Sequence, residues 1–545
     1  MTDGLLGLGV SPGRTAGPVY RMAPPPRLPD EEPVVADLGG EVGRASGALR
    51  FVAGTLTGLA EAATGTAAEV LDVASLMAAD PTLLDAVARR VRAGRPAEWA
   101  IAEAVAEQRD TLAALGGYLA ERAADLDDIR DRALAHLLGL PMPGVPEPGT
   151  PFVLIAEDLA PADTARLDPA RVLAVVTRRG GPTSHTAILA RSLGLPAVVS
   201  CPGILDLADG TVVAVDGATG AVAPVPAGAA ESIRAEAERD RLRLAESSGP
   251  GRTADGHPVR LLLNVGSAAG IDADAEGVGL FRTEFLFLDR VSAPSVAEQE
   301  HAYAEVFAAL GGRRVVLRTL DAGADKPLPF LGMPAEDNPA LGVRGLRVAR
   351  TRPEVLDGQL EAVARAAKAT GAEVWVMAPM VATRPEAAEF AARVRAAGLP
   401  AAGVMVEVPA AALQASRLLE VVDFLSIGTN DLSQYTLAAD RTNGDLADLL
   451  DPWQPALLEL VAACAAAGRA AGKPVGVCGE AAADPALAPV FAGLGITSLS
   501  MAGPAIPAVR AALAQRTLTE CERLAHAVLT APDAATARRL GTGSP

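Results

Sequence analysis

His185 is the residue whose surroundings point most clearly to covalent chemistry. It follows a double glycine and begins an apolar run in the segment TRRGGPTSHTAILARSLGLPAVV, residues 177–199. That run predicts a helix, and Thr183 or Ser184 is placed to cap it. The N–H groups and dipole at a helix start favour negative charge, and a neutral imidazole is a nucleophile. The segment therefore indicates a histidine that can carry a phosphoryl group, with a capping or packed histidine as the alternative.

Two carboxylates are placed to bind a divalent metal ion. Glu407 lies in VMVEVPAA and Asp431 in SIGTNDLSQY, each near the end of a short apolar run. Mg²⁺ commonly takes one or two carboxylates together with substrate oxygens and water. Buried carboxylates without a cation would be costly. The pair predicts a Mg²⁺ site, unless one or both carboxylates pair with Arg344 or Arg441.

Three arginines could supply an anion-binding pocket. They are Arg282 in LFRTEFLF, Arg318 in VVLRTLD and Arg441 in AADRTN. Guanidinium groups bind carboxylate and phosphate in a bidentate manner. In a chain with a formal net charge of −18, three arginines beside a metal would create a locally positive pocket. Surface salt bridges are the alternative for each of them.

Cys478 ends an apolar run in PVGVCGEAA. A thiol in a polar site can donate or accept a proton near neutral pH if its environment allows. A packed structural cysteine is the alternative. The four cysteines have no zinc-type spacing, and we expect no disulfides.

The elements that would bring these residues together are eight short β-like runs between residues 259 and 513, separated by helical stretches. Eight βα units over about 260 residues are typical of a TIM barrel, and continuous apolar runs favour a buried parallel sheet. A doubly wound sheet is the alternative fold. Polar residues recur near the carboxyl ends of the runs, where a barrel enzyme does its chemistry. They are Asn264, Arg282, Arg318, Glu407, Asn430, Asp431, Cys478 and Ser500.

The rest of the chain predicts an α/β multidomain protein. Strand-like runs at the N-terminus and between Phe152 and Val225 predict one α/β domain, and Ala/Leu-rich periodicity between them predicts an inserted bundle of about four helices. A charged helix then leads to a Gly/Ser/Pro break that could act as a hinge. The expected parts are 1–33 with 141–225 (α/β domain), 34–140 (helical bundle), 226–255 (linker helix and hinge), 256–530 (TIM barrel) and 531–545 (C-terminal tail).

Composition restricts the partners and the location. The net charge of −18 argues against nucleic acid and against an anionic membrane surface. No apolar run reaches the roughly 18 residues needed to span a bilayer. The start, MTDGLLGLGVSPG, has no basic region before its apolar stretch, so we expect no signal peptide and a cytoplasmic protein.

Taken together, these segments resemble the enzyme I family of bacterial sugar phosphotransferase systems. GGPTSHTAILARSLGLPAVV resembles the family's phosphohistidine signature. The segments LFRTEFLF, RTLDAGADKPLPF, NPALGVRGLR, GVMVEVPAA, DFLSIGTNDLSQYTLAADR and VCGE resemble its phosphoenolpyruvate-domain motifs, in the family's order. The resemblance covers nearly the whole chain.

The resemblance implies an enzyme that transfers the phosphoryl group of phosphoenolpyruvate to its own histidine and then to the phosphocarrier protein HPr. The bundle would dock HPr, and family members are typically homodimers through the barrel. The implied roles are nucleophile for His185, Mg²⁺ ligands for Glu407 and Asp431, substrate binding for Arg282, Arg318, Asn430, Asp431 and Arg441, and protonation of the enolate by Cys478.

Other functions share part of this pattern. Pyruvate phosphate dikinase and phosphoenolpyruvate synthase share the histidine and barrel segments, but they need a large ATP-binding domain. The residues before His185 read as a short bundle without a phosphate-binding glycine loop. A metal-dependent barrel lyase acting on a pyruvate enolate gives the GGPTSH segment no role. A non-catalytic regulatory phosphocarrier would not need Glu407, Asp431 and Arg318.

Overall fold

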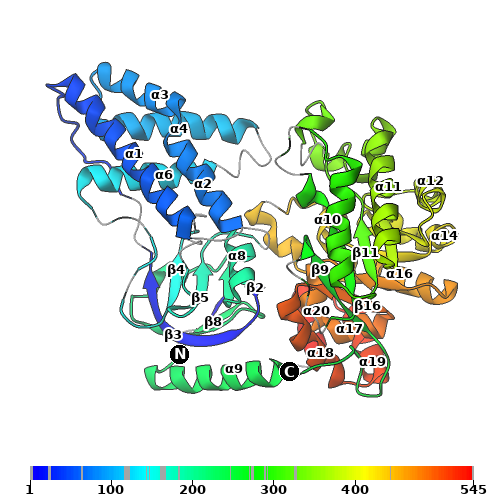
Figure 1. The fold of residues 1–545 in the computed structure, drawn as a ribbon. Helices are drawn as coiled ribbons and strands as arrows, with labels where there is room; N and C mark the ends of the chain where they lie inside the picture. Colours follow the sequence, from blue (N-terminus) through cyan, green and yellow to red (C-terminus); the bar gives the residue numbers. More distant parts are fainter. Residues whose placement is uncertain are drawn as a thin grey trace. The chain divides into compact units, whose positions relative to one another are not determined.

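The computed structural model divides the chain into two compact units, Met1–Arg239 and Asp240–Pro545. Each unit has its own hydrophobic cores. Figure 1 shows the helices and strands of both units. The described residues are 4–542 except 23–25, 63–65, 116–122, 141, 143, 147, 160–166, 182–184, 246, 269–270, 272–274, 288–289, 291, 324–327 and 442.

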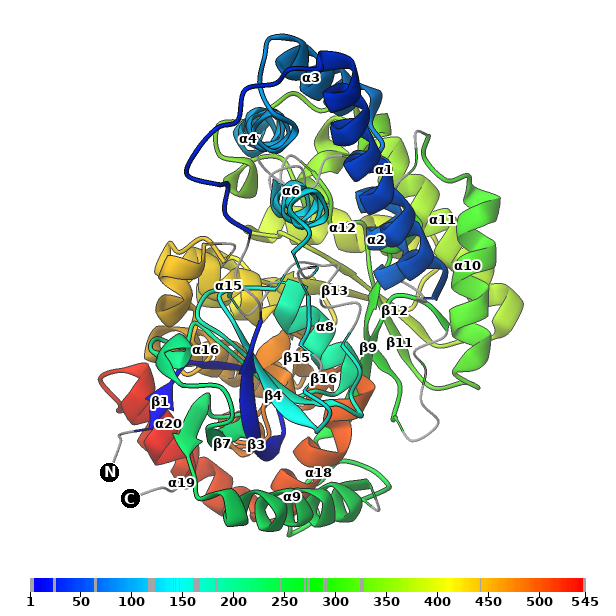
Figure 2. The same cartoon turned by 90° about the vertical axis from the view of Figure 1, so that its left-hand side faces the viewer.

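The first unit is built on a mixed eight-stranded sheet in the order β1-β8-β7-β3-β4-β5-β6-β2. Strand β3 pairs in parallel with β4, although more than a hundred residues separate them in the chain (Figure 2). The N-terminal strands therefore belong to the same sheet as the later ones, as the sequence predicts. The strands are β1 (Leu5–Leu6), β2 (Leu8–Ser11), β3 (Arg14–Arg21), β4 (Phe152–Ala156), β5 (Val172–Thr177), β6 (Ala197–Val199), β7 (Val212–Asp216) and β8 (Ala221–Pro224).

Helices fill the interval between β3 and β4. The described residues form five of them there, one more than the sequence suggests, and they bury a common core rich in Ala, Leu and Val. The break at Asp80-Pro81 is a helix start, because the Asp80 carboxylate accepts a hydrogen bond from the Thr82 N–H and Pro81 needs no donor there. The helices are α1 (Leu38–Ala62), α2 (Thr66–Ala78), α3 (Pro81–Arg92), α4 (Ala97–Leu115) and α6 (Ala123–Leu138).

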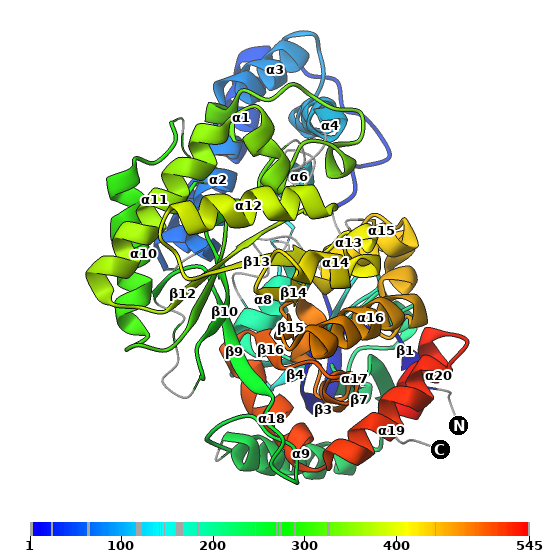
Figure 3. The same ribbon diagram turned by 90° about the vertical axis from the view of Figure 1, so that its right-hand side faces the viewer.

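The second unit contains a closed barrel of eight parallel strands in the order β10-β11-β12-β13-β14-β15-β16-β9 (Figure 3). The register of β16 on β9 closes it. The TIM barrel is confirmed, and the doubly wound alternative is wrong. The strands are β9 (Arg260–Val265), β10 (Val278–Arg282), β11 (Val315–Arg318), β12 (Val374–Ala378), β13 (Ala401–Val406), β14 (Phe424–Ile427), β15 (Val475–Val477) and β16 (Ser498–Met501).

Helices surround the barrel and share one large apolar core with the outer faces of its strands. Three of the helices begin with a capping box, at Ser295, Thr383 and Thr517, which satisfies N–H groups at their first turns. The longer helices are α10 (Val296–Ala309), α11 (Pro353–Thr370), α12 (Arg384–Ala396), α15 (Thr429–Leu437), α16 (Pro455–Ala471), α17 (Leu487–Leu494), α18 (Ile506–Ala514) and α19 (Leu518–Leu529).

The end of the chain forms a further helix, α20 (Ala534–Thr542), in the segment expected as a tail. Arg538 pairs with Asp451 at 2.9 Å, and a side chain at Gly541 would collide with the ring of Trp453. This helix therefore packs against the barrel unit. The boundary between the two units falls inside α9 (Ala230–Ala245). None of the helices formed by the described residues is long and apolar enough to cross a lipid bilayer.

Candidate active site at the carboxyl ends of the barrel strands

The barrel brings most of the predicted residues to one end. Arg282 and Arg318 are the last residues of β10 and β11, and Glu407 directly follows β13. Asp431 and Asn430 lie in the first turn of α15, directly after β14. Because all eight strands are parallel, these carboxyl ends lie at the same mouth of the barrel.

Arg318 is held by two carboxylates, Glu284 and Asp321, that are not among the residues predicted from the sequence. Its guanidinium lies 3.0 Å from Glu284 Oε1 and 3.1 Å from Asp321 Oδ2, and the residue is only 9% exposed. Burial opposes its positive charge, but Glu284 and Asp321 outweigh burial and raise the pKa of Arg318. The group is therefore permanently charged and fixed in orientation. Glu284 and Asp321 both lie inside segments that resemble the family, LFRTEFLF and RTLDAG, which is the signal that could have found them.

Arg344 connects the carboxylates across the mouth. Its guanidinium lies 3.0 Å from Asp321 Oδ2 and 3.3 Å from Asp431 Oδ1, and the residue is 1% exposed. A β-bridge to Gly323 positions its backbone, and a Cβ at Gly323 would collide with Arg344 itself. Arg441 contacts the other oxygen of Asp431 at 3.3 Å. Asp431 thus forms ion pairs with both Arg344 and Arg441, the two arginines predicted as the alternative to a metal ion.

Glu407 is the carboxylate with the most perturbed chemistry. It is 1% exposed, and its Oε1 accepts a 2.6 Å hydrogen bond from the Met380 N–H. Burial, followed by repulsion from Asp321 and Asp431, raises the pKa of Glu407 to about 8, although Arg318 and Arg344 oppose this. Burial and the neighbouring carboxylates therefore favour the protonated form of Glu407 up to about pH 8.

These residues fit a divalent cation. No group of three His, Cys, Asp or Glu side chains within the described ranges is arranged around a metal position. Mg²⁺ needs only one or two protein carboxylates, with substrate oxygens and water completing the shell. A cation between Glu407 and Asp431 would relieve the repulsion that raises the pKa of Glu407. Its binding would compete with the contacts of Arg344 and Arg441 to Asp431.

Cys478 directly follows β15 and lies close to the same cluster. Burial raises the pKa of its thiol to about 11, while Ser426 and Arg318 act in the opposite direction. The thiol is therefore protonated near neutral pH. Asn264 holds the backbone here, because its Nδ2 donates to the Cys478 carbonyl at 3.0 Å and its Oδ1 accepts from Ser500 at 2.6 Å.

Arg282 and Asn430 complete the mouth. Burial, followed by repulsion from Arg318, lowers the pKa of Arg282. In the part of the chain that the structure describes, its guanidinium forms no ion pair or side-chain hydrogen bond, so it can receive an anion. Asn430 Oδ1 accepts a 3.0 Å hydrogen bond from the Glu480 N–H, which orients the amide.

His185 lies in the other unit, where it is the first residue of α8 (His185–Leu193). The helix predicted there is confirmed. The candidate caps Thr183 and Ser184 lie outside the described residues. Thr186, the next residue of the helix, donates to Asp158 Oδ1 at 3.4 Å.

Comparison with known proteins first identifies a class. Residues 243–518 match the family described as PEP-utilising enzyme, PEP-binding domain. Residues 148–220 match the mobile domain of PEP-utilising enzymes, and residues 6–122 match their N-terminal domain. The three matches follow one another along the chain and include both the barrel mouth and His185.

Sequence identity to individual relatives identifies a more specific family within this class. The chain is 54% identical to a phosphoenolpyruvate-protein phosphotransferase of Streptomyces coelicolor, over 99% of this chain and 98% of that protein. It is 42% identical to a protein of the same name from Haloferax volcanii, over 83% and 82% of the two chains. It is 40% identical to a multiphosphoryl transfer protein of Xanthomonas campestris, over 98% of this chain and 66% of that protein. The chain belongs to the phosphoenolpyruvate-protein phosphotransferase family, and the resemblance seen in the sequence is confirmed.

Proposed function

We propose that the chain transfers the phosphoryl group of phosphoenolpyruvate to His185 and then to a histidine of the phosphocarrier protein HPr, releasing pyruvate. The observation that carries this proposal is the buried cluster of guanidinium and carboxylate groups at the barrel mouth, in a chain that aligns end to end with a protein named for this activity. The dikinase and lyase alternatives have no comparable support, since the relatives reported above are phosphotransferases and multiphosphoryl transfer proteins.

Substrate binding would fall to the cationic groups of the mouth. With the pKa of Glu407 at about 8, this residue is largely protonated at neutral pH, so the neighbouring arginines retain a surplus of positive charge. Arg282 and Arg318 would bind the carboxylate and phosphoryl oxygens, with Asn430 and Arg441 at the α15 side. Glu407 and Asp431 would hold Mg²⁺, and Glu407 would release its proton on binding the ion. When bound, this ion would neutralise phosphoryl charge.

The chemical step would then have two parts. A ring nitrogen of His185 attacks phosphorus, and the bond between phosphorus and the enolate oxygen breaks. The enolate carbon takes a proton from the Cys478 thiol to give pyruvate, and the resulting thiolate regains a proton from solvent. A thiol that burial keeps protonated suits an acid better than a nucleophile.

The helical bundle would dock HPr, and the chain would work as a homodimer in the cytoplasm. The segment from Asp30 to Asp131 contains 19 Asp and Glu residues against 9 Arg and no Lys. We therefore expect a basic face on the carrier. We propose the same domain boundaries as those predicted from the sequence, and we propose that residues 226–255 act as a hinge.

The test is to incubate the protein with Mg²⁺ and phosphoenolpyruvate and to look for acid-labile, base-stable phosphate on His185. His185→Ala should accept none while keeping its circular dichroism spectrum, and Glu407→Ala or excess chelator should abolish labelling of the wild type. Transfer to a carrier by His185→Ala would refute the role of this histidine. Full labelling in chelator and in Glu407→Ala would refute the metal site but leave the histidine in place.

A further inference from the structure

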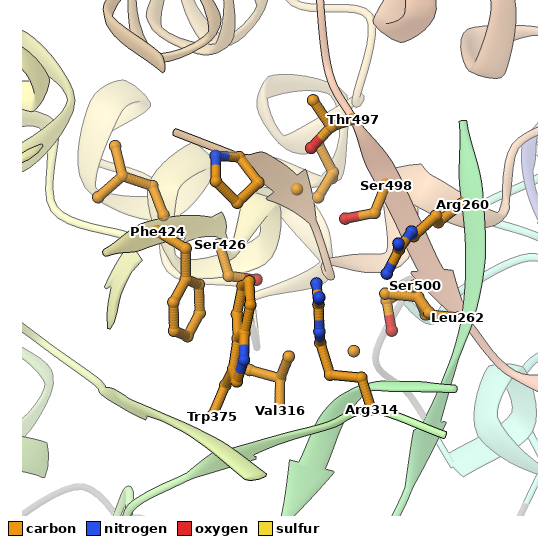
Figure 4. A pocket seen from close by; sticks show the side chains of 15 residues that line it. Arg260, Leu262, Arg314, Val316, Trp375, Phe424, Ser426, Thr497, Ser498 and Ser500 are labelled. Atoms are coloured by element: carbon orange, nitrogen blue, oxygen red, sulfur yellow. The ribbon is translucent and has the colours of Figure 1, made fainter. Parts of the chain in front are cut away.

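The end of the barrel opposite the candidate active site contains a cavity of about 290 Å³ (Figure 4). Much of its wall comes from residues at or near the amino-terminal ends of the strands. Arg260, Phe424 and Ser498 are the first residues of β9, β14 and β16, and all three line it. The candidate active site uses the last residues of the strands, whereas this cavity lies at the other end of the barrel. Only its inner wall, at Ser426 and Ser500, lies beside residues of the active site, namely Cys478 and Asn264. Its volume is that of about ten water molecules, which suits a small metabolite.

The cavity exists because small residues occupy positions that usually carry branched apolar side chains. The interior of a TIM barrel is normally filled by layers of Val, Ile and Leu. Here Gly279, Gly476, Ser426 and Ser500 line the space. A Cβ at Gly279 would lie 2.5 Å from the Ser500 hydroxyl oxygen, so this glycine allows the two strands' residues to approach.

The rim of the cavity is positively charged. Arg314 stacks on Trp375, with its guanidinium carbon 3.6 Å from the ring centroid. Glu373 accepts from both of them, from Arg314 Nε at 3.2 Å and from Trp375 Nε1 at 3.0 Å. Among the residues that the structure describes, no carboxylate pairs with Arg260. Of the two arginines of the rim, only Arg314 thus has a carboxylate partner among the described residues. Burial together with repulsion from Arg260 lowers the pKa of Arg314.

The remaining walls divide into hydroxyl and apolar surfaces. Ser498 lies on the Arg260 side in Figure 4, and Ser426 and Ser500 are buried deeper in the barrel. Trp375 and Phe424 form an aromatic wall, with ring centroids 4.9 Å apart. A pocket with convergent cations, hydroxyl donors and an aromatic wall matches the chemistry of a small organic anion.

We propose that this amino-terminal mouth of the barrel binds a small organic anion, whose oxyanion lies on Arg260 and Arg314 and whose apolar part packs against Trp375 and Phe424. The proposal does not depend on the phosphotransferase activity. A purely structural role would explain the pair of Arg314 with Glu373 and the close approach at Gly279. It gives no purpose to Arg260, which has no carboxylate partner among the described residues.

Benzoate is the probe, because it joins one carboxylate to an aromatic ring, and benzamide is its neutral counterpart. Binding to the full-length protein is measured by calorimetry and by tryptophan fluorescence. We expect saturable binding of benzoate, little binding of benzamide, and a dissociation constant about tenfold or more higher in Arg260→Gln and in Arg314→Gln. Trp375→Phe should lose most of the fluorescence change but keep the calorimetric signal.

Two control variants separate this cavity from other anion sites. Arg523→Gln removes the same charge from a side chain that is 74% exposed on α19, and should bind benzoate like the wild type. Arg318→Gln tests the catalytic mouth. Equal affinity for benzamide, or no saturable binding of benzoate, would overturn the proposal. The proposal would also be overturned if Arg318→Gln lost its affinity for benzoate while Arg260→Gln kept it. Benzoate would then occupy the carboxyl-terminal mouth of the barrel.

Discussion

Glu407 makes the stability of the barrel dependent on pH. Its pKa is raised to about 8 in the folded protein and should be near 4.5 in the unfolded chain. Between these values the folded state binds more protons than the unfolded state, so the free energy of unfolding falls as pH rises. The stabilisation is fully present below about pH 4.5 and is lost as pH rises toward 8.

Glutamine cannot ionise. We therefore expect the free energy of unfolding of Glu407→Gln not to show the fall with rising pH that Glu407 causes. Compared with the variant, the metal-free wild type should lose up to about 1.4 kcal/mol of unfolding free energy per pH unit between pH 5 and 7. Urea unfolding of both proteins at several pH values measures the difference. Parallel pH profiles for the two proteins would show that Glu407 is ionised in the folded state.

Cys478 should affect the second half of the reaction more than the first. Cys478→Ser replaces a buried thiol, whose pKa is about 11, by a hydroxyl that is a much weaker acid. Pyruvate should appear more slowly, because the enolate would have to take its proton from water. Labelling of His185 should survive better, since it depends on the arginines and the imidazole. Single-turnover experiments that follow pyruvate and phosphohistidine separately decide this, and unchanged pyruvate kinetics would make Cys478 a packed thiol.

At the scale of elements, the loop that carries Arg344 depends on one glycine. Gly345 has a φ of +58°, and a Cβ there would lie 3.0 to 3.1 Å from Met380 and Pro379. Met380 in turn donates its N–H to Glu407. The loop after β11 and the end of β12 are thus packed together beneath the charged cluster.

Gly345→Ala should lower the free energy of unfolding by about 1–3 kcal/mol and raise the KM for phosphoenolpyruvate, because Arg344 would shift with the loop. Gly332→Ala is the matched control. Gly332 has nearly the same φ, +59°, but an added Cβ would meet nothing within 4 Å. Gly332→Ala should therefore lose only the unfolding free energy that the strained backbone costs, and its KM for phosphoenolpyruvate should not change. Urea unfolding and steady-state kinetics of both variants test this, and an equal rise in KM would contradict the packing argument.

At the scale of the whole molecule, the two units should be separable. The first unit buries its own cores in the bundle and on both faces of the sheet. We expect a fragment of about residues 1 to 250 to fold alone and to exchange phosphate with a phosphorylated carrier, because it contains His185 and the bundle.

The acidic bundle predicts how this exchange responds to ionic strength. Attraction between oppositely charged faces weakens as salt screens it. The carrier's dissociation constant should therefore rise with salt for both the fragment and the full chain, as measured by calorimetry. Salt-independent binding, or binding that needs the barrel, would contradict the assignment of the bundle as the docking site.

The local pattern of apolar and polar residues in the sequence was sufficient to predict the architecture. Eight apolar runs separated by helical stretches predicted the barrel, and residues at the ends of those runs, such as Arg318 and Glu407, were placed correctly at one mouth. This works because strand periodicity and chain direction are local properties, and parallel closure then brings all carboxyl ends together. The fifth helix of the bundle was missed, because it differs little from its neighbouring helices in composition.

Tertiary structure alone decided the charge state and partners of the site. One buried chain of ion pairs joins Asp321, Arg344 and Asp431. It results from packing between residues that lie far apart in the sequence. The raised pKa of Glu407 follows from the same packing, because desolvation and like-charge repulsion depend on distances in space. The amino-terminal cavity also arises only when Gly279 and Ser426 face the same interior. Spacing along the chain determines which elements form, but burial and electrostatics depend on which side chains those elements bring within a few ångströms of each other.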